Sequence, residues 1–197
     1  MLISAAVAAA IAAMIAVYPY IIEADVKMTD NPRHPVHSKN LQKATFAAGC
    51  FWHVQHSFQH LLGVIDTIVG YTGGHLDNPT YEDICYSNTG HAEAVQITYD
   101  TNVISYEKLL DTFWKIHDPT TPNRQGPDIG SQYRSAIFFH DQKQLAAAKH
   151  SRNELQHSGK FENSIVTEIK PAKKFYKAEN YHQNYFHKNR RTTCLLK

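Results

Sequence analysis

Cysteine is scarce in this chain, and the shortage limits the class of protein that it can be. Its 197 residues include only three cysteines, Cys50, Cys85 and Cys194. A small and odd number of cysteines cannot form a full disulfide framework. The count therefore argues against a disulfide-stapled scaffold and favours redox or nucleophilic use of at least one thiol.

Strong net charge and several common functional motifs are also lacking. The chain has 20 basic and 18 acidic residues and a formal net charge of +2. This balance indicates neither a nucleic-acid-binding surface nor a field that attracts acidic substrates. There is no internal repeat, no HExxH or CxxC motif and no phosphate-binding glycine motif. A hydrophobic content of 43% over 197 residues instead suits one ordinary globular domain plus a leader.

The N-terminal 22 residues contain no charged side chain, and residues 2–17 are almost entirely alanine, isoleucine, valine and methionine. Such a stretch predicts a signal peptide or an N-terminal membrane anchor at residues 1–24. Residues 25–42 are polar and contain proline, which predicts a linker to a folded domain at residues 43–197. We therefore expect an exported or membrane-anchored protein, attached through residues 2–22 if the leader is retained. Translation from Met28 would instead give a cytoplasmic protein.

Cys50 lies where a predicted strand, at residues 43–48, becomes a predicted helix that Gly63 ends. Unpaired backbone N–H groups and the helix dipole favour an anion in the first turn of a helix. We therefore expect a depressed pKa and a reactive thiolate at Cys50. Phe51 and Trp52 would provide an apolar surface for a substrate group. Taken alone, the tetrapeptide Gly-Cys-Phe-Trp is equally compatible with a buried structural cysteine.

The remaining hydrophobic pattern predicts four more strands, at residues 64–69, 92–99, 135–139 and 165–169. Helices are predicted at residues 106–117, capped by Ser105, and from Asp141 to about Gln156. A long polar loop covers residues 118–130, and loops of this length are usually functional. Strands and helices without strict alternation predict an α+β fold. We expect a single compact domain with a mixed central sheet, flanking helices and a long irregular C-terminal tail.

Five sequence blocks occur in a fixed order along the predicted domain. They are TFAAGCFW (45–52), GYTGG (70–74), PTY (79–81), TGHAEAV (89–95) and DIGSQYRS (128–135). Together they resemble the class A peptide methionine sulfoxide reductases over about residues 43–194. The resemblance implies reduction of the S epimer of methionine sulfoxide, free or in proteins, as repair of oxidative damage. It also implies a monomer with no bound cofactor or metal, reduced by thioredoxin or an equivalent dithiol.

Sulfoxide reduction needs a nucleophile for sulfur and a proton for the departing oxygen. Cys50 can supply the first, and Glu93, in an apolar strand that should raise its pKa, is the candidate for the second. Spacing alone would make Glu93 an ordinary outward-facing strand residue. The resemblance assigns Glu93 as the acid and Tyr81 and Tyr133 as hydrogen-bond donors to the sulfoxide oxygen. It also makes Asp128 an organising or proton-relay carboxylate, and Phe51 and Trp52 the cradle of the substrate methyl group.

Recycling of the enzyme requires a second thiol, which condenses with the sulfenic acid on Cys50 to form a disulfide. The resemblance implies that Cys194 is this resolving cysteine and that Cys85 is a buried or bystander thiol. The tail departs from the family pattern. Residues 190–193 are Arg-Arg-Thr-Thr, and the chain stops three residues after Cys194.

His53, His56 and His60 share one face of the predicted helix, which raises the question of zinc. Three ligands on one helix converge poorly, because the first and last are about 10 Å apart along the axis. We predict a solvated histidine face. Two other functions remain possible from the residues alone. One is a cysteine hydrolase in which His91 is the base for Cys50, and the other is a non-catalytic exported binding domain.

Overall fold

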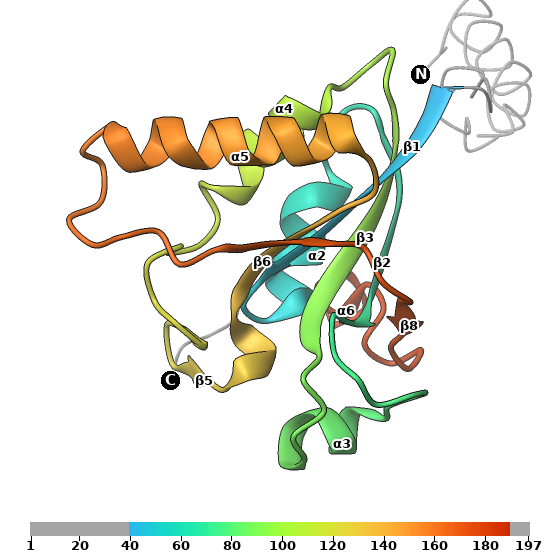
Figure 1. Cartoon of the computed structure of the whole chain (residues 1–197). Coiled ribbons are helices and arrows are strands. Elements are labelled where there is room, and N and C mark those ends of the chain that lie inside the picture. The colour runs from blue at the N-terminus through green and yellow to red at the C-terminus, as the bar shows by residue number, and fades with distance from the viewer. Residues whose placement is uncertain (1–39, 190–197) are drawn as a thin grey trace, which may run out of the picture. The chain divides into compact units, whose positions relative to one another are not determined.

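The structure is a computed structural model, and it describes residues 40–189 of the chain (Figure 1). The predicted leader, residues 25–39 of the predicted linker, and Cys194 lie outside this range. Strand β1 begins at Leu41, so the folded domain starts two residues before the predicted boundary at Lys43. Within the described range, no helix is long and apolar enough to cross a membrane.

A six-stranded sheet forms the centre of the domain, with the order β7-β6-β1-β3-β2-β8. Its strands are β1 (Leu41–Ala48), β2 (Val64–Thr72), β3 (Ala92–Asp100), β6 (Ser135–Phe139), β7 (Glu168–Pro171) and β8 (Tyr176–Lys177). The β6–β7 pair is parallel, whereas β1, β3, β2 and β8 pair antiparallel with their neighbours. The sheet is therefore mixed, which confirms the predicted α+β class.

Three predicted helices are present, and their observed ends differ from the predicted ends by only a few residues. They are α2 (Phe51–Gln59), α4 (Tyr106–Phe113) and α5 (Gln142–His157). The hydroxyl of Ser105 accepts a hydrogen bond from the N–H of Lys108, and the carboxylate of Asp141 accepts one from Gln144, as expected of N-caps.

Several short elements lie in segments for which we predicted no helix or strand. The long loop contains a hairpin of β4 (Arg124–Gln125) and β5 (Asp128–Ile129), followed by the 3₁₀ turn η3 (Ser131–Tyr133). Helix α3 (Tyr81–Tyr86) begins with a capping box of Thr80 and Asp83. The tail contains β8 and α6 (Tyr185–Lys188). The C-terminal segment is therefore more ordered, up to Lys188, than the prediction of an irregular tail.

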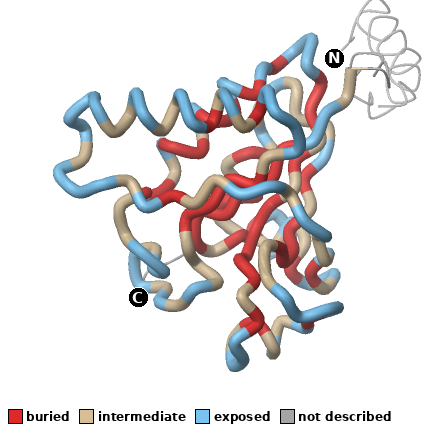
Figure 2. Tube along the Cα trace, in the orientation of Figure 1, coloured by how far each residue is buried: buried red, intermediate tan, exposed pale blue. Residues whose placement is uncertain are grey.

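The main core lies on one face of the sheet, where α2, α4 and α5 contribute buried apolar side chains. Phe46 of β1 stacks on Phe58 of α2 and on Phe113 of α4, with ring centroids 5.4 and 5.2 Å apart. Figure 2 shows the buried residues gathered along the central strands. This packing fixes α2, and hence Cys50 at its start, against the end of β1.

The opposite face of the sheet is covered by the segment that runs from β7 to β8, which crosses it in Figure 1. Small residues make room for this segment. At Gly70, an added Cβ would lie 2.2 Å from the carbonyl oxygen of Tyr176 and 2.6 Å from the ring of Phe175. Glycine at position 70 therefore allows β8 to pair closely with β2.

His117 makes folding stability depend on pH. Its buried imidazole contacts the carbonyl oxygen of Phe113 and the hydroxyl of Ser135, both at 2.7 Å. Burial lowers the pKa of His117 to about 4, whereas an unfolded histidine titrates near 6.5. The unfolded chain therefore gains the proton first, so this stability is present above about pH 6.5 and is lost as the pH falls towards 4. The free energy of unfolding should fall by about 3 kcal/mol over this range.

We expect His117→Gln to flatten the fall in the free energy of unfolding between pH 6.5 and 4, measured by urea denaturation. His150→Gln is the matched control, because the His150 side chain is 74% exposed. Equal pH slopes for wild type and His117→Gln would contradict this assignment.

Candidate active site

Cys50 is the N-cap residue of α2 and follows β1 after one glycine. Gly49 has a φ of +88°, and a Cβ at this position would lie 2.6 Å from the side chain of Gln125. Both the backbone turn and the close approach of the long loop therefore require glycine here. The first turn of α2 contains no acidic residue that would repel a thiolate. Cys50 is half-buried, so a substrate can reach it.

Glu93 lies in β3 beside the start of α2. Its Oε2 accepts a hydrogen bond of 3.1 Å from the backbone N–H of Phe51, the residue after Cys50. The residue is only 2% exposed. Burial raises the pKa of Glu93 to about 8, against the opposing effect of the Phe51 hydrogen bond and with help from the charge of Asp128. The carboxyl group therefore keeps its proton at neutral pH and is available as an acid.

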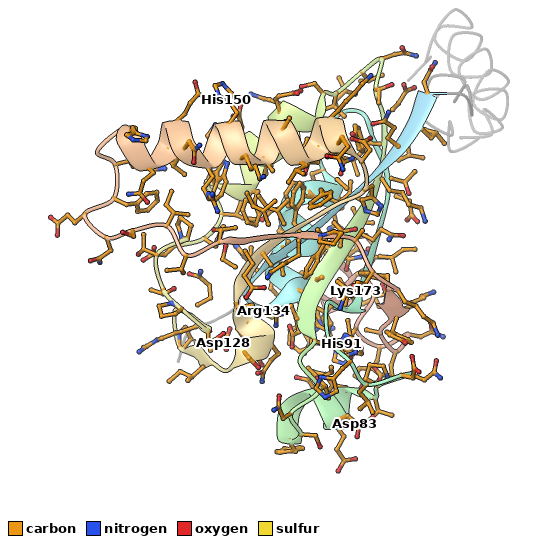
Figure 3. The ribbon with its side chains drawn as sticks, viewed as in Figure 1. Asp83, His91, Asp128, Arg134, His150 and Lys173 are labelled. Atoms are coloured by element: carbon orange, nitrogen blue, oxygen red, sulfur yellow. The ribbon has the colours of Figure 1, made fainter. Side chains whose placement is uncertain are left out.

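Three further side chains surround this pair from separate elements: Tyr81 from α3, Asp128 from β5 and Tyr133 from η3. Burial, followed by the charge of Glu93, raises the pKa of both phenols, so each hydroxyl remains a hydrogen-bond donor. Burial also raises the pKa of Asp128, which is labelled in Figure 3. The structure thus brings the predicted polar residues together from α3 and the long loop.

The predicted apolar surface divides into a buried and an exposed part. Phe51 is 1% exposed and lies against Tyr71, whereas Trp52 is half-buried. Trp52 therefore supplies most of the apolar surface that a substrate can touch. It stacks on Tyr185 of α6 at a centroid distance of 3.7 Å, and its indole N–H donates to Nδ1 of His182 at 3.1 Å.

Four residues that contact this site were missed by the sequence reasoning: Tyr71, Glu179, His182 and Tyr185. Three of them belong to the tail segment AENYHQNY (178–185), which has no helical or strand periodicity. Its density of aromatic and polar side chains is the only signal that could have drawn attention to it.

The geometry of His91 argues against the hydrolase alternative. Its Nδ1 accepts from the N–H of Gly74 at 3.1 Å, and its Nε2 contacts the carbonyl oxygen of Leu76 at 2.8 Å. Nε2 must therefore carry the proton and donate it. Both ring nitrogens of this buried histidine hold the backbone of the glycine turn, which leaves neither to act as a base for Cys50.

The structure modifies two further predictions, those for Cys85 and for the histidine face of α2. Cys85 is half-buried in α3, and it hydrogen-bonds the phenol of Tyr81, so it contacts the site rather than standing apart from it. The histidine face of α2 is only partly solvated, because His56 packs edge-on against Phe186 of α6. Among residues 40–189, no group of three or more His, Cys, Asp or Glu could hold a metal ion.

A half-buried thiol beside a protonated buried carboxyl group is suited to redox chemistry at sulfur. The fold and site therefore define a thiol-dependent oxidoreductase. The family profile of the peptide methionine sulfoxide reductases matches residues 42–197. The chain belongs to this family and to its class A, and its activity is the reduction of methionine sulfoxide in protein repair.

Similar proteins cover most of the domain. The peptide methionine sulfoxide reductase MsrA of Methanosarcina acetivorans is 59% identical over 150 residues, which are 76% of this chain and 80% of that protein. MsrA of Methanothermobacter thermautotrophicus is 59% identical over 155 residues, covering 79% and 92%. The crystal structure of reduced Mxr1 from Saccharomyces cerevisiae has a TM-score of 0.74 and 38% identity, covering 79% of this chain and 90% of that one.

Proposed function

We propose that this enzyme reduces the S epimer of methionine sulfoxide by attack of the Cys50 thiolate on the substrate sulfur. Glu93 gives a proton to the departing oxygen. The observation that carries the proposal is the environment of Glu93, which is 2% exposed, has a pKa raised to about 8 and is hydrogen-bonded to the residue after Cys50. Such a group delivers a proton at neutral pH, where an ordinary glutamate has already lost it.

The reaction balances as a two-electron exchange between two sulfur atoms. The thiolate of Cys50, one proton and the sulfoxide give a sulfenic acid on Cys50 and the thioether of methionine. The sulfur–oxygen bond of the substrate breaks, and an oxygen–sulfur bond to Cys50 remains in its place. Glu93 supplies the proton and recovers it from solvent. The phenols of Tyr81 and Tyr133 donate hydrogen bonds to the oxygen as negative charge develops on it.

Binding of the substrate follows from the surfaces around Cys50. The exposed face of Trp52, supported by Phe51, accepts the methyl group next to the sulfoxide sulfur. Asp128 contributes by its charge, which favours the protonated form of Glu93. An apolar surface on one side and oxygen-binding hydroxyls on the other would accept one configuration at sulfur, which supports selectivity for the S epimer.

We further propose recycling by Cys194 and thioredoxin. Cys194 condenses with the sulfenic acid, forming a disulfide with release of water, and a thioredoxin-type dithiol reduces the disulfide. Cys194 lies six residues beyond Lys188, where α6 ends, and six residues can span at most about 20 Å. The contact of α6 with Trp52, two residues from Cys50, supports this pairing. A solved complex of yeast Mxr1 with Trx2, 32% identical to this chain with a TM-score of 0.53, supports thioredoxin as the donor.

The epimer selectivity is tested with the two separated epimers of a blocked methionine sulfoxide, without added reductant and with thiol titration before and after. We expect conversion of the S epimer alone, with the loss of two thiols per enzyme, those of Cys50 and Cys194. Equal conversion of both epimers, or conversion without loss of thiols, would overturn the proposal.

We also propose that the enzyme acts as a monomer that is exported or membrane-attached through residues 2–22. The proposed location is supported by the absence of charge from residues 1–22. N-terminal sequencing of the protein from its native cells distinguishes a chain cleaved after Ala24 from one that retains the leader or begins at Met28. Sedimentation analysis reports the oligomeric state.

A further inference from the structure

Glu179, a carboxylate outside the proposed chemistry, connects three parts of the active site. It lies in the segment between β8 and α6. Its Oε1 accepts from the backbone N–H of Tyr81 at 2.8 Å, and its Oε2 accepts from the hydroxyl of Tyr71 at 2.9 Å. The same Oε2 lies 3.8 Å from Nε2 of His182. Glu179 therefore contacts α3, the sheet and the tail at once.

Glu179 is negatively charged in this environment. Burial acts to raise its pKa, but hydrogen bonds from its own backbone and from Tyr81 and Tyr71 outweigh burial and lower the pKa overall. A carboxylate thus faces the imidazole of His182 at neutral pH.

His182 is held in one tautomer by its neighbours. Its side chain is 1% exposed, and Nδ1 accepts the indole N–H of Trp52 at 3.1 Å, so Nδ1 carries no proton. The proton must then be on Nε2. That atom is buried, finds no hydrogen-bond partner among residues 40–189, and faces the negative oxygen of Glu179. Burial lowers the pKa of His182 against the effect of Glu179, which keeps the ring neutral.

We propose that Glu179 is a positioning residue for sulfoxide reduction, which orients Trp52 by holding His182 as its Nε2–H tautomer. The negative oxygen attracts the Nε2–H dipole, and this leaves the lone pair of Nδ1 directed at the indole of Trp52. The inference rests on the proposed function, because it assigns the substrate-binding surface to Trp52. The side-chain hydrogen bonds of Glu179 come from Tyr81 and Tyr71, and Glu179 acts on Trp52 through His182.

Glu179→Gln tests the proposal because it should make His182 favour the Nδ1–H tautomer instead of the Nε2–H tautomer. The amide oxygen of the new side chain can take the place of Oε1 and still accept from the backbone N–H of Tyr81. The amide NH₂ then takes the place of Oε2 and faces Nε2 of His182. An NH₂ group donates to a bare Nε2 and so favours the Nδ1–H tautomer, which repels the indole N–H of Trp52. We expect KM for the S epimer to rise about fivefold to tenfold, the size typical of one lost hydrogen bond, while kcat changes by a smaller factor.

A spectroscopic readout separates positioning from a general loss of structure. The chain has two tryptophans, and the indole N–H of Trp114 donates to Ser151 of α5, which is not a member of this network. In ¹⁵N-labelled protein, Glu179→Gln should shift the indole signal of Trp52 and leave that of Trp114 in place. Glu154→Gln is the matched control, because Glu154 forms an exposed carboxylate–histidine pair with His150 at 3.4 Å.

The wild-type protein gives an independent test that needs no variant. The ¹⁵N shifts of the His182 ring should show a protonated Nε2 and a bare Nδ1. An Nδ1–H tautomer would overturn the proposal even if Glu179→Gln fails to fold. Unchanged KM and an unmoved Trp52 signal in a folded Glu179→Gln variant would also overturn it. Absence of sulfoxide reduction in the wild type, with the tautomer as stated, would instead count against the proposed function.

Discussion

Glu93→Gln is expected to lower the rate constant of methionine sulfoxide reduction by about 10²-fold to 10⁴-fold at neutral pH, the usual contribution of a general acid. Glutamine has the same shape, and its amide oxygen can still accept from the N–H of Phe51. It cannot give a proton to the departing oxygen. The measurement is a single turnover of the S epimer by pre-reduced enzyme, with methionine quantified after an acid quench.

The dependence of the reduction rate on pH gives a second test of Glu93 as the acid. Because the pKa of Glu93 is raised to about 8, the acid is protonated below this pH, and the wild-type rate should decline as the pH rises through it. In Glu93→Gln this decline should be absent. A variant that keeps the wild-type rate, or a wild-type profile that is flat through pH 8 to 9, would refute the role of Glu93 as acid. Glu154→Gln, which removes an exposed carboxylate, should behave as wild type.

The same substitution should leave the fold intact and stabilise it. In the unfolded chain a glutamate titrates near 4.3, so the unfolded state is ionised at pH 7 while folded Glu93 holds its proton. Stability is therefore lost as the pH rises from the unfolded pKa towards 8. Glutamine has no charge to lose, and the free energy of unfolding at pH 7 should rise by up to about 3 kcal/mol. This gain would distinguish a catalytic defect from unfolding.

Cys194→Ser is expected to stop thioredoxin-dependent turnover after about one methionine per enzyme, because the sulfenic acid on Cys50 then lacks its proposed resolving thiol. Wild-type enzyme should continue at a constant rate under the same conditions. The assay couples thioredoxin to its reductase and follows methionine together with oxidation of the reductant. A small dithiol such as dithiothreitol should restore turnover to the variant, since it can reach Cys50 directly.

Cys85→Ser is the matched control for this experiment. Cys85 contacts Tyr81 in α3 and is the chain's remaining cysteine. We expect this variant to turn over with thioredoxin at a rate near that of wild type. Sustained turnover by Cys194→Ser, together with arrest in Cys85→Ser, would transfer the resolving role to Cys85.

The strongly periodic parts of the fold were predictable from the sequence. The apolar spacing of α2 and α4 and the alternation in β3 reflect burial against the sheet, and capping side chains mark the helix starts. Elements of two to six residues were missed, including α3 and the β4–β5 hairpin. They are too short to show a period, and their conformation is set by contacts with the rest of the domain.

Site residues were predictable from the sequence where neighbouring residues in the chain create their chemical environment. Cys50 could be placed because a strand-to-helix junction creates its environment within the sequence itself. Asp128 and Tyr133 looked like loop residues, and only the family resemblance singled them out. Glu179 and His182 were missed because their roles arise from contacts with residues about 100 or more positions away, such as Tyr81 and Trp52. No local pattern encodes such contacts.

The central claim is that Cys50 takes the oxygen from the substrate, and one measurement tests it most directly. In the variant Cys85→Ser/Cys194→Ser, Cys50 is the only thiol of the chain. After treatment with one equivalent of the S epimer, we expect methionine in equal amount. Mass spectrometry should then find a sulfenic acid, trapped by a dione reagent, on the peptide that contains Cys50. Methionine formed while Cys50 remains an unmodified thiol would contradict the account.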